Sequence, residues 1–103
     1  MNMHSLPRNV FFHAVNLACR ARFPSLLAAW LPDGQQRGQE WVALNPTRSD
    51  RRAGSFKINT VTGRWADFAT GDKGGDPVSL YAYLNGMSQS DAARALSQEW
   101  GLK

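Results

Sequence analysis

Cysteine is nearly absent from this sequence. Cys19 stands alone among 103 residues, so no internal disulfide can form. The chain also lacks the basic start and apolar run of a secretory signal, and it has no apolar stretch long enough to span a membrane. These absences favour the reducing cytoplasm as the compartment of the protein.

Acidic side chains are outnumbered by basic ones, with 8 Asp and Glu against 12 Lys and Arg. The net charge is +4 and the pI is about 9.8, so we expect a charged partner to be polyanionic, with nucleic acid as the first candidate. The length and the hydrophobic content of 43% allow one small core. We therefore expect residues 1–103 to form a single domain.

The groups that catalysis needs are missing as a set. His4, His13 and Cys19 all lie in the N-terminal part, and no Ser or Asp is tied to them by a recognisable spacing. Because a nucleophile, a base and an orienting group are not visible together, we expect neither an enzyme nor a cofactor.

Turn-forming residues are concentrated in the stretch from Trp65 to Asp76, WADFATGDKGGD. A phosphate-binding loop would need Gly-Lys followed by Ser or Thr, whereas Asp76 follows these glycines. Asp67, Asp72 and Asp76 are a sparse ligand set for magnesium. A turn that leads into a helix capped by Asp76 is the stronger interpretation.

Apolar residues at helical spacing predict four helices. The first contains Phe11 and Val15, and the second runs from Pro24 to Leu31. The third begins at Asp76-Pro77 and ends at Gly86, and the fourth follows a capping box of Ser88 and Asp91 and buries Leu96 and Trp100.

Three short runs between the helix pairs alternate between apolar and polar residues: EWVAL, SFKIN and RWADF. Alternation with turn residues between the runs predicts antiparallel strands. We expect an α+β fold in which a small three-stranded antiparallel sheet packs with about four helices. Residues 1–34 would be the N-terminal helical part, residues 40–103 the sheet and C-terminal helices, and the polar run DGQQRGQ between them a loop.

Basic and aromatic residues are interleaved between positions 48 and 73. In proteins that bind single strands, aromatic rings stack on bases while Arg and Lys contact phosphates. In the other interpretation the aromatic rings form the core and the charges are merely solvated, and for at least one ring this must hold. The candidate DNA-binding residues, with Trp65 as the first choice for stacking, are Arg48, Arg51, Arg52, Lys57, Arg64, Trp65, Phe68 and Lys73.

The run from Trp41 to Leu96 resembles the zinc-binding domain of bacterial DNA primases. Gly54-Ser55-Phe56 stands at the Pro-Ser-Phe strand of that family, and Gly74-Gly75-Asp76 stands at its helix start. Asn45-Pro46-Thr47-Arg48 matches its Cys-Pro-x-His motif, and the stretch from Asp67 to Gly71 matches its Cys-x-x-Cys-Gly motif. All four ligand positions are replaced, by Asn45, Arg48, Asp67 and Thr70.

The resemblance implies a zinc-ribbon-like domain without zinc, similar to modules of primase-helicase proteins from phages, plasmids and integrating elements. Hydrogen bonds in which Asn45, Asp67 or Thr70 accept from loop amides would take the place of the metal. Trp30, Trp41 and Trp65 would enlarge the core.

The function implied is that of a non-catalytic module that binds single-stranded DNA during replication or priming of a mobile element or phage. A primase, polymerase or helicase would be its protein partner. The alternative is a domain that docks a replicative helicase or polymerase without touching DNA. Burial of both Trp65 and Phe68, with the side chains of Arg51, Arg52 and Arg64 pointing in different directions, would favour this alternative.

Overall fold

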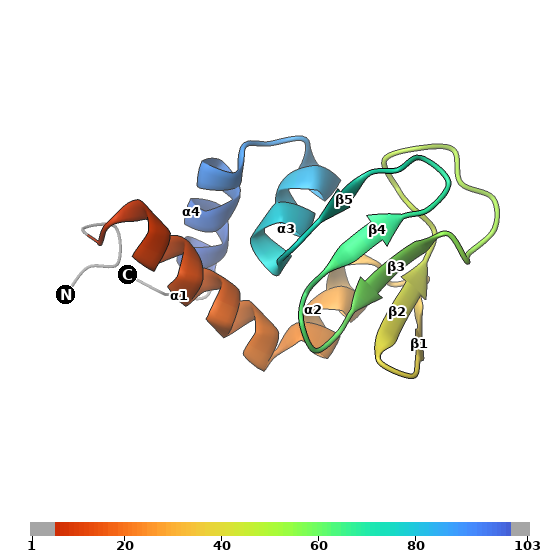
Figure 1. Cartoon of the computed structure of the whole chain (residues 1–103), viewed down its shortest axis with the longest axis horizontal. Coiled ribbons are helices and arrows are strands. Elements are labelled where there is room, and N and C mark those ends of the chain that lie inside the picture. Colours follow the sequence, from red (N-terminus) through yellow and green to blue (C-terminus); the bar gives the residue numbers. More distant parts are fainter. Residues whose placement is uncertain (1–5, 100–103) are drawn as a thin grey trace.

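The computed structural model describes residues 6–99 and has the α+β architecture expected from the sequence (Figure 1). Helices α1 and α2 precede the strands, and α3 and α4 follow them. The elements are α1 (Arg8–Ala21), α2 (Phe23–Trp30), β1 (Gln35–Arg37), β2 (Glu40–Ala43), β3 (Phe56–Asn59), β4 (Trp65–Asp67), β5 (Lys73–Gly74), α3 (Pro77–Asn85) and α4 (Gln89–Glu99).

The antiparallel sheet has five strands in the order β1-β2-β3-β4-β5, which corrects the expected three. The three expected strands are β2, β3 and β4, and an edge strand is added on each side. Strand β1 forms a hairpin with β2 through Gly38, whose φ is +61°. Its three residues are polar and exposed, so they lack the alternation that marks a half-buried strand. Strand β5 has only two residues and pairs with β4.

The two faces of the sheet differ in what they carry. On β3, Phe56 and Ile58 are buried, whereas Lys57 and Asn59 point to the other side and are only half-buried. The register extends this division across the sheet, because residues paired across antiparallel strands share a face. Figure 1 shows α2 behind the sheet and no helix over its front. We call this front the outer face.

The core consists of two clusters that meet at α3. Val78 and Ala82 pack with α1 and α4, whereas Leu80 packs with α2 and the sheet. Leu26 and Trp30 of α2 touch both clusters. The molecule is elongated, 44 × 24 × 19 Å, with α1, α3 and α4 at one end and the sheet at the other (Figure 1).

The ends of α3 follow the sequence prediction. The Ser79 amide donates to Asp76 Oδ1 at 2.8 Å in a capping box, and Gly86 ends the helix with φ +63°. For α4, the Asp91 amide donates to Ser88 Oγ at 3.0 Å. Leu96 is fully buried, and Trp100 lies outside the described residues.

Two glycines of WADFATGDKGGD have structural roles: Gly71 forms the turn, and Gly74 lets β5 pack closely against Trp65. Gly71 has φ +84°, which suits glycine in the turn between β4 and β5. A Cβ on Gly74 would lie 2.4 Å from the indole nitrogen of Trp65, so only glycine lets β5 approach this ring. The turn-and-cap interpretation of this stretch is confirmed.

Candidate nucleic-acid interface

The outer face of the sheet brings several candidate residues into one row. Lys57 of β3 pairs with Ala66 of β4, and Ala66 pairs with Lys73 of β5. Neighbouring strands are about 4.8 Å apart, so the backbones of the two lysines are about 10 Å apart with a small alanine between them. Arg64 precedes Ala66 by two residues and Phe68 follows it by two, which places both on the same side of β4.

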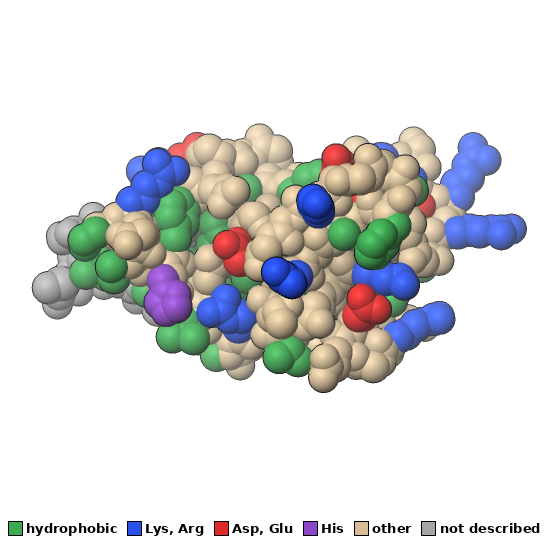
Figure 2. Space-filling view, viewed as in Figure 1, with side chains coloured by type: hydrophobic (Ala, Val, Ile, Leu, Met, Phe, Trp, Pro, Cys, Tyr) green, Lys and Arg blue, Asp and Glu red, His purple; other side chains and the backbone are tan. Residues whose placement is uncertain are grey.

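The basic side chains of this face are not neutralised. Arg37, Arg64 and Lys73 are exposed and Lys57 is half-buried, and no ion pair joins them to a carboxylate within residues 6–99. Figure 2 shows basic side chains gathered over the sheet around a hydrophobic one. Unpaired cations on one surface raise the local potential and attract a polyanion.

Phe68 is the aromatic side chain that this face offers to a ligand. Its side chain is 72% exposed, and Lys57 Nζ lies 5.9 Å from its ring centroid. Large aromatic rings normally bury most of their area, so an exposed ring among cations is suited to stack on a base.

Trp65 cannot take the stacking role expected of it. It is only 5% exposed, its ring lies 4.6 Å from that of Tyr83, and its indole N–H donates to Ser79 Oγ. The expectation is corrected because β4 directs Trp65 to the core and Phe68, beyond the end of the strand, to solvent.

Arg48 is engaged inside the molecule rather than facing a ligand. Its Nε donates to Asp67 Oδ2 at 2.8 Å, its Nη2 donates to Ser55 Oγ at 3.0 Å, and Nη2 lies 3.4 Å from Asp50 Oδ2. A phosphate would have to compete with these carboxylates. We therefore correct its assignment from DNA contact to positioning of the loop.

Three of the four positions matched to zinc ligands meet in a hydrogen-bond network around the buried Asp67. Asp67 Oδ2 accepts from Asn45 Nδ2 at 2.8 Å as well as from Arg48. Asn45 Nδ2 also donates to the Tyr83 hydroxyl, which in turn donates to Asp72 Oδ2. We call Asn45, Arg48, Asp50, Ser55, Asp67 and Tyr83 the Asp67 network.

The hydrogen bond from Arg48 is the main cause that lowers the pKa of Asp67. Burial opposes this shift, and the donors Asn45 and the Ala69 amide add to it. The same bond raises the pKa of Arg48. The pair therefore stays ionised and ties the loop after β2 to the end of β4.

Loop amides are also satisfied as the sequence predicted. The Thr47 amide donates to Asn45 Oδ1, the Ala69 amide to Asp67 Oδ1 and the Asp72 amide to Thr70 Oγ1. Thr70, the fourth matched position, is exposed and remains outside the Asp67 network.

Arg51 and Arg52 extend the basic surface beyond the sheet. Both are exposed in the loop between β2 and β3, and neither forms an ion pair within the described range 6–99. In Figure 2, basic side chains project from the edge of the molecule where this loop lies. The Asp67 network holds the base of the loop through Asn45 and Arg48.

A hollow of about 300 Å³ lies in the outer face. Ala66 lines it together with the candidates Lys57, Arg64 and Phe68. Glu40 and Asn59 also line it and were missed, as was Arg37 on β1. Only the pairing of β1 with β2 and of β2 with β3 identifies these residues as part of the face.

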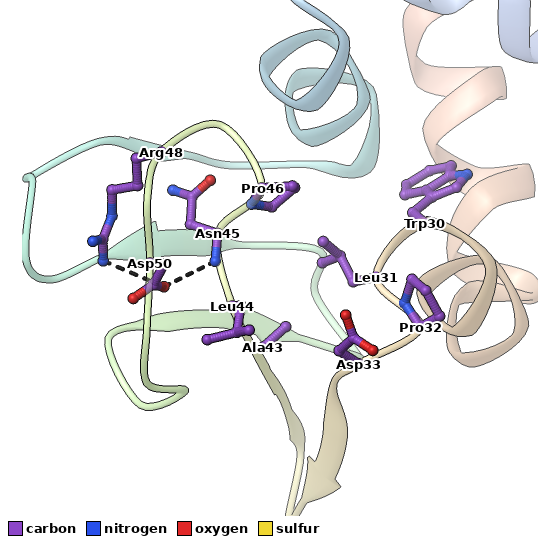
Figure 3. A pocket seen from close by; sticks show the side chains of 10 residues that line it. All are labelled: Trp30, Leu31, Pro32, Asp33, Ala43, Leu44, Asn45, Pro46, Arg48 and Asp50. Atoms are coloured by element: carbon purple, nitrogen blue, oxygen red, sulfur yellow. Dashed lines mark hydrogen bonds and ion pairs between the residues drawn. The ribbon is translucent and has the colours of Figure 1, made fainter.

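A second hollow, of about 220 Å³, lies between the end of α2 and the loop after β2 (Figure 3). Trp30, Pro32 and Pro46 contribute apolar walls and Asp33 contributes a carboxylate, whereas the Asp50 carboxylate is engaged by Arg48 and the Asn45 amide. Its volume is below the range of about 300–1,000 Å³ that is usual for small-molecule sites, so it suits a single side chain of a partner.

The other candidate chemistries have structural roles. Cys19 is buried, and this burial raises its pKa to about 12, so its thiol is a poor nucleophile. Asp67 accepts from Arg48 in the Asp67 network, and Asp72 accepts from the Tyr83 hydroxyl. Asp76 caps the N-terminus of α3. No group of three or more potential metal ligands gathers in the described part of the chain, and none of its helices is long and apolar enough to cross a membrane.

Comparison with known proteins adds no relative, because no protein-family model matches the sequence and no curated protein matches it significantly.

Proposed function

We propose that this protein is a non-catalytic module that binds single-stranded DNA on the outer face of its sheet. The observation that carries the proposal is the exposed Phe68 ring among the unpaired cations Lys57, Arg64 and Lys73. Such a face combines the two elements of single-strand binding, stacking on bases and contact with phosphates.

The resemblance to the zinc-binding domain of bacterial primases supports a role in replication or priming of a mobile element or phage. The Asp67 network supports this resemblance, because its hydrogen bonds join three of the positions at which that family carries zinc ligands. Hydrogen bonds and an ion pair would then fix the two loops in a zinc-ribbon-like arrangement without metal.

The test is fluorescence anisotropy of labelled oligothymidine across a salt series. Each lost phosphate contact reduces the slope of log affinity against log salt by about 0.7, so Lys57→Ala with Lys73→Ala should reduce it by about 1.4. The matched control is Arg8→Ala with Arg94→Ala, which removes the same charge from the helical end. Absence of binding at low salt, or an equal slope for the two double variants, would refute the proposal.

A second candidate function is docking of a replicative helicase or polymerase. It is favoured by the hollow of Figure 3, where apolar walls beside the exposed carboxylate of Asp33 suit an apolar or basic anchor. Asp33→Lys should weaken binding to the purified helicase or polymerase and leave the binding of oligothymidine unchanged. An unchanged protein interaction would exclude the hollow as the docking site.

A further inference from the structure

Glu40 is an acidic residue in the middle of an otherwise basic surface. It pairs with Arg37 of β1 and Asn59 of β3 across the strands, which places it on the outer face and in the wall of the hollow. No hydrogen bond or ion pair reaches its carboxylate from any described residue. A carboxylate repels phosphate, so at this position it would weaken DNA binding unless it meets a hydrogen-bond donor of the ligand.

The hollow has the form of a site for one unstacked base. On the outer face, the large side chains of Arg64 and Phe68 flank β4 on either side of Ala66, and the short side chain of Ala66 leaves the space between them. The exposed Phe68 ring and the cationic side chains of Lys57 and Arg64 also line the hollow. Single-stranded bases are recognised by stacking on such rings and by hydrogen bonds to their Watson–Crick edges.

The polar groups of the wall select among the bases. A carboxylate only accepts hydrogen bonds and has two oxygens to do so. Asn59 Oδ1 already accepts from the amides of Val61 and Thr62, which leaves the Asn59 Nδ2 group as a donor without a partner in residues 6–99. Glu40 on β2 and Asn59 on β3 therefore place two acceptors beside one donor, and the Thr62 hydroxyl and the donors Lys57 and Arg64 line the rest of the hollow.

Guanine alone presents the complementary edge. Its N1–H and its amino group are adjacent donors, and its O6 is the acceptor next to them. Cytosine and adenine place a single amino group beside a ring nitrogen that accepts, and thymine places its one N–H between two carbonyls. Against these bases the Glu40 carboxylate would meet at least one acceptor, which is repulsive.

We infer that the hollow lined by Glu40, Asn59 and Phe68 binds one guanine base of a single DNA strand, with the Glu40 carboxylate accepting from N1–H and the amino group. This inference rests on the proposed function and deepens it. The face would bind any single strand through phosphates and stacking, and Glu40 would add a preference for strands with an accessible guanine.

The test compares oligothymidine with the same strand carrying one central guanine, cytosine or adenine, by anisotropy at fixed salt. The wild-type protein should bind the guanine strand about tenfold more tightly than oligothymidine, as a bidentate base contact can provide. Glu40→Gln should abolish this preference while affinity for oligothymidine stays equal or rises, since a negative charge is lost. Glu99→Gln, the same change on α4, should keep the preference.

The outcomes separate the two levels of the proposal. Equal binding of all four strands by the wild-type protein, or a guanine preference that persists in Glu40→Gln, would overturn the guanine site and leave single-strand binding intact. Absence of binding to every strand would overturn both. Thermal melting of Glu40→Gln checks that the fold is retained.

Discussion

At the scale of single residues, the chemistry of a side chain in this protein depends on whether the fold turns it to the interior or to solvent. Phe68 and Trp65 are three positions apart, yet one is 72% exposed and the other 5%. Arg48 and Lys57 are both basic, yet one donates to a buried carboxylate and the other stays without an ion pair among the described residues. Composition alone treats each pair as equivalent, and the fold separates them: β4 turns Trp65 to the core, and the loop after β2 brings Arg48 to Asp67.

We expect Phe68→Ala to weaken binding of oligothymidine by about 1–3 kcal/mol, because one stacked base loses its platform. The salt slope should stay unchanged, since no phosphate contact is removed. Val61→Ala is the matched control, because Val61 is an apolar residue with 60% exposure outside the hollow. Anisotropy titrations that show the same loss for both variants would contradict a stacking role of Phe68.

The Asp67 network predicts a pH dependence of stability. Because the pKa of Asp67 is lowered in the folded state, its contribution is complete above the unfolded value of about 3.9 and is lost as the pH falls below it. The stability difference between the wild type and Asp67→Asn, measured by urea unfolding, should therefore be constant above about pH 5 and shrink as the pH falls from about pH 5 to about pH 2. The control is Asp33→Asn, which makes the same substitution at an exposed aspartate outside the Asp67 network. A difference that is constant with pH would show that the ion pair contributes nothing.

At the scale of elements, the sequence predicted those that bury an apolar stripe and missed those that do not. The apolar positions of α1 and α2 and the alternation of β3 indicate their type directly. Strands β1 and β5 contribute no buried apolar side chain, so they form only because a neighbouring strand offers its free backbone groups. The candidate site was predicted in part for the same reason, because Lys57, Arg64 and Phe68 belong to or flank predicted strands and Arg37 does not.

Helix α4 is held to the rest of the molecule by its buried face, and a substitution of Leu96 tests this packing. Leu96 of α4 is fully buried against α1 and α3, so Leu96→Ala should lower the free energy of unfolding by about 2–5 kcal/mol. Gln98→Ala, an exposed change on the same helix, should stay within about 0.5 kcal/mol. Chemical denaturation of both variants gives the comparison, and a loss for Leu96→Ala as small as that for Gln98→Ala would refute the packing.

At the scale of the whole molecule, we predict that the purified protein holds no stoichiometric zinc and keeps its melting temperature in a chelator. Arg48 occupies one matched ligand position, and a guanidinium that always carries its proton cannot bind a cation. Structural zinc needs about four ligands, and Asp67 is the only one of the four matched residues that carries a negative charge with which to bind the metal. Elemental analysis that finds one zinc per chain, or unfolding by the chelator, would contradict this prediction.

The position of α3 between two clusters has a consequence for how the molecule opens. Its residues Val78 and Ala82 face the helical end while Leu80 faces the sheet, so neither half can separate without exposing one side of this helix. Amide protons of α3 should therefore exchange with solvent only through global unfolding, whereas those of the edge strand β1 exchange through local fraying. The outer face of the sheet and the helical end far from it would in this way share one cooperative unit.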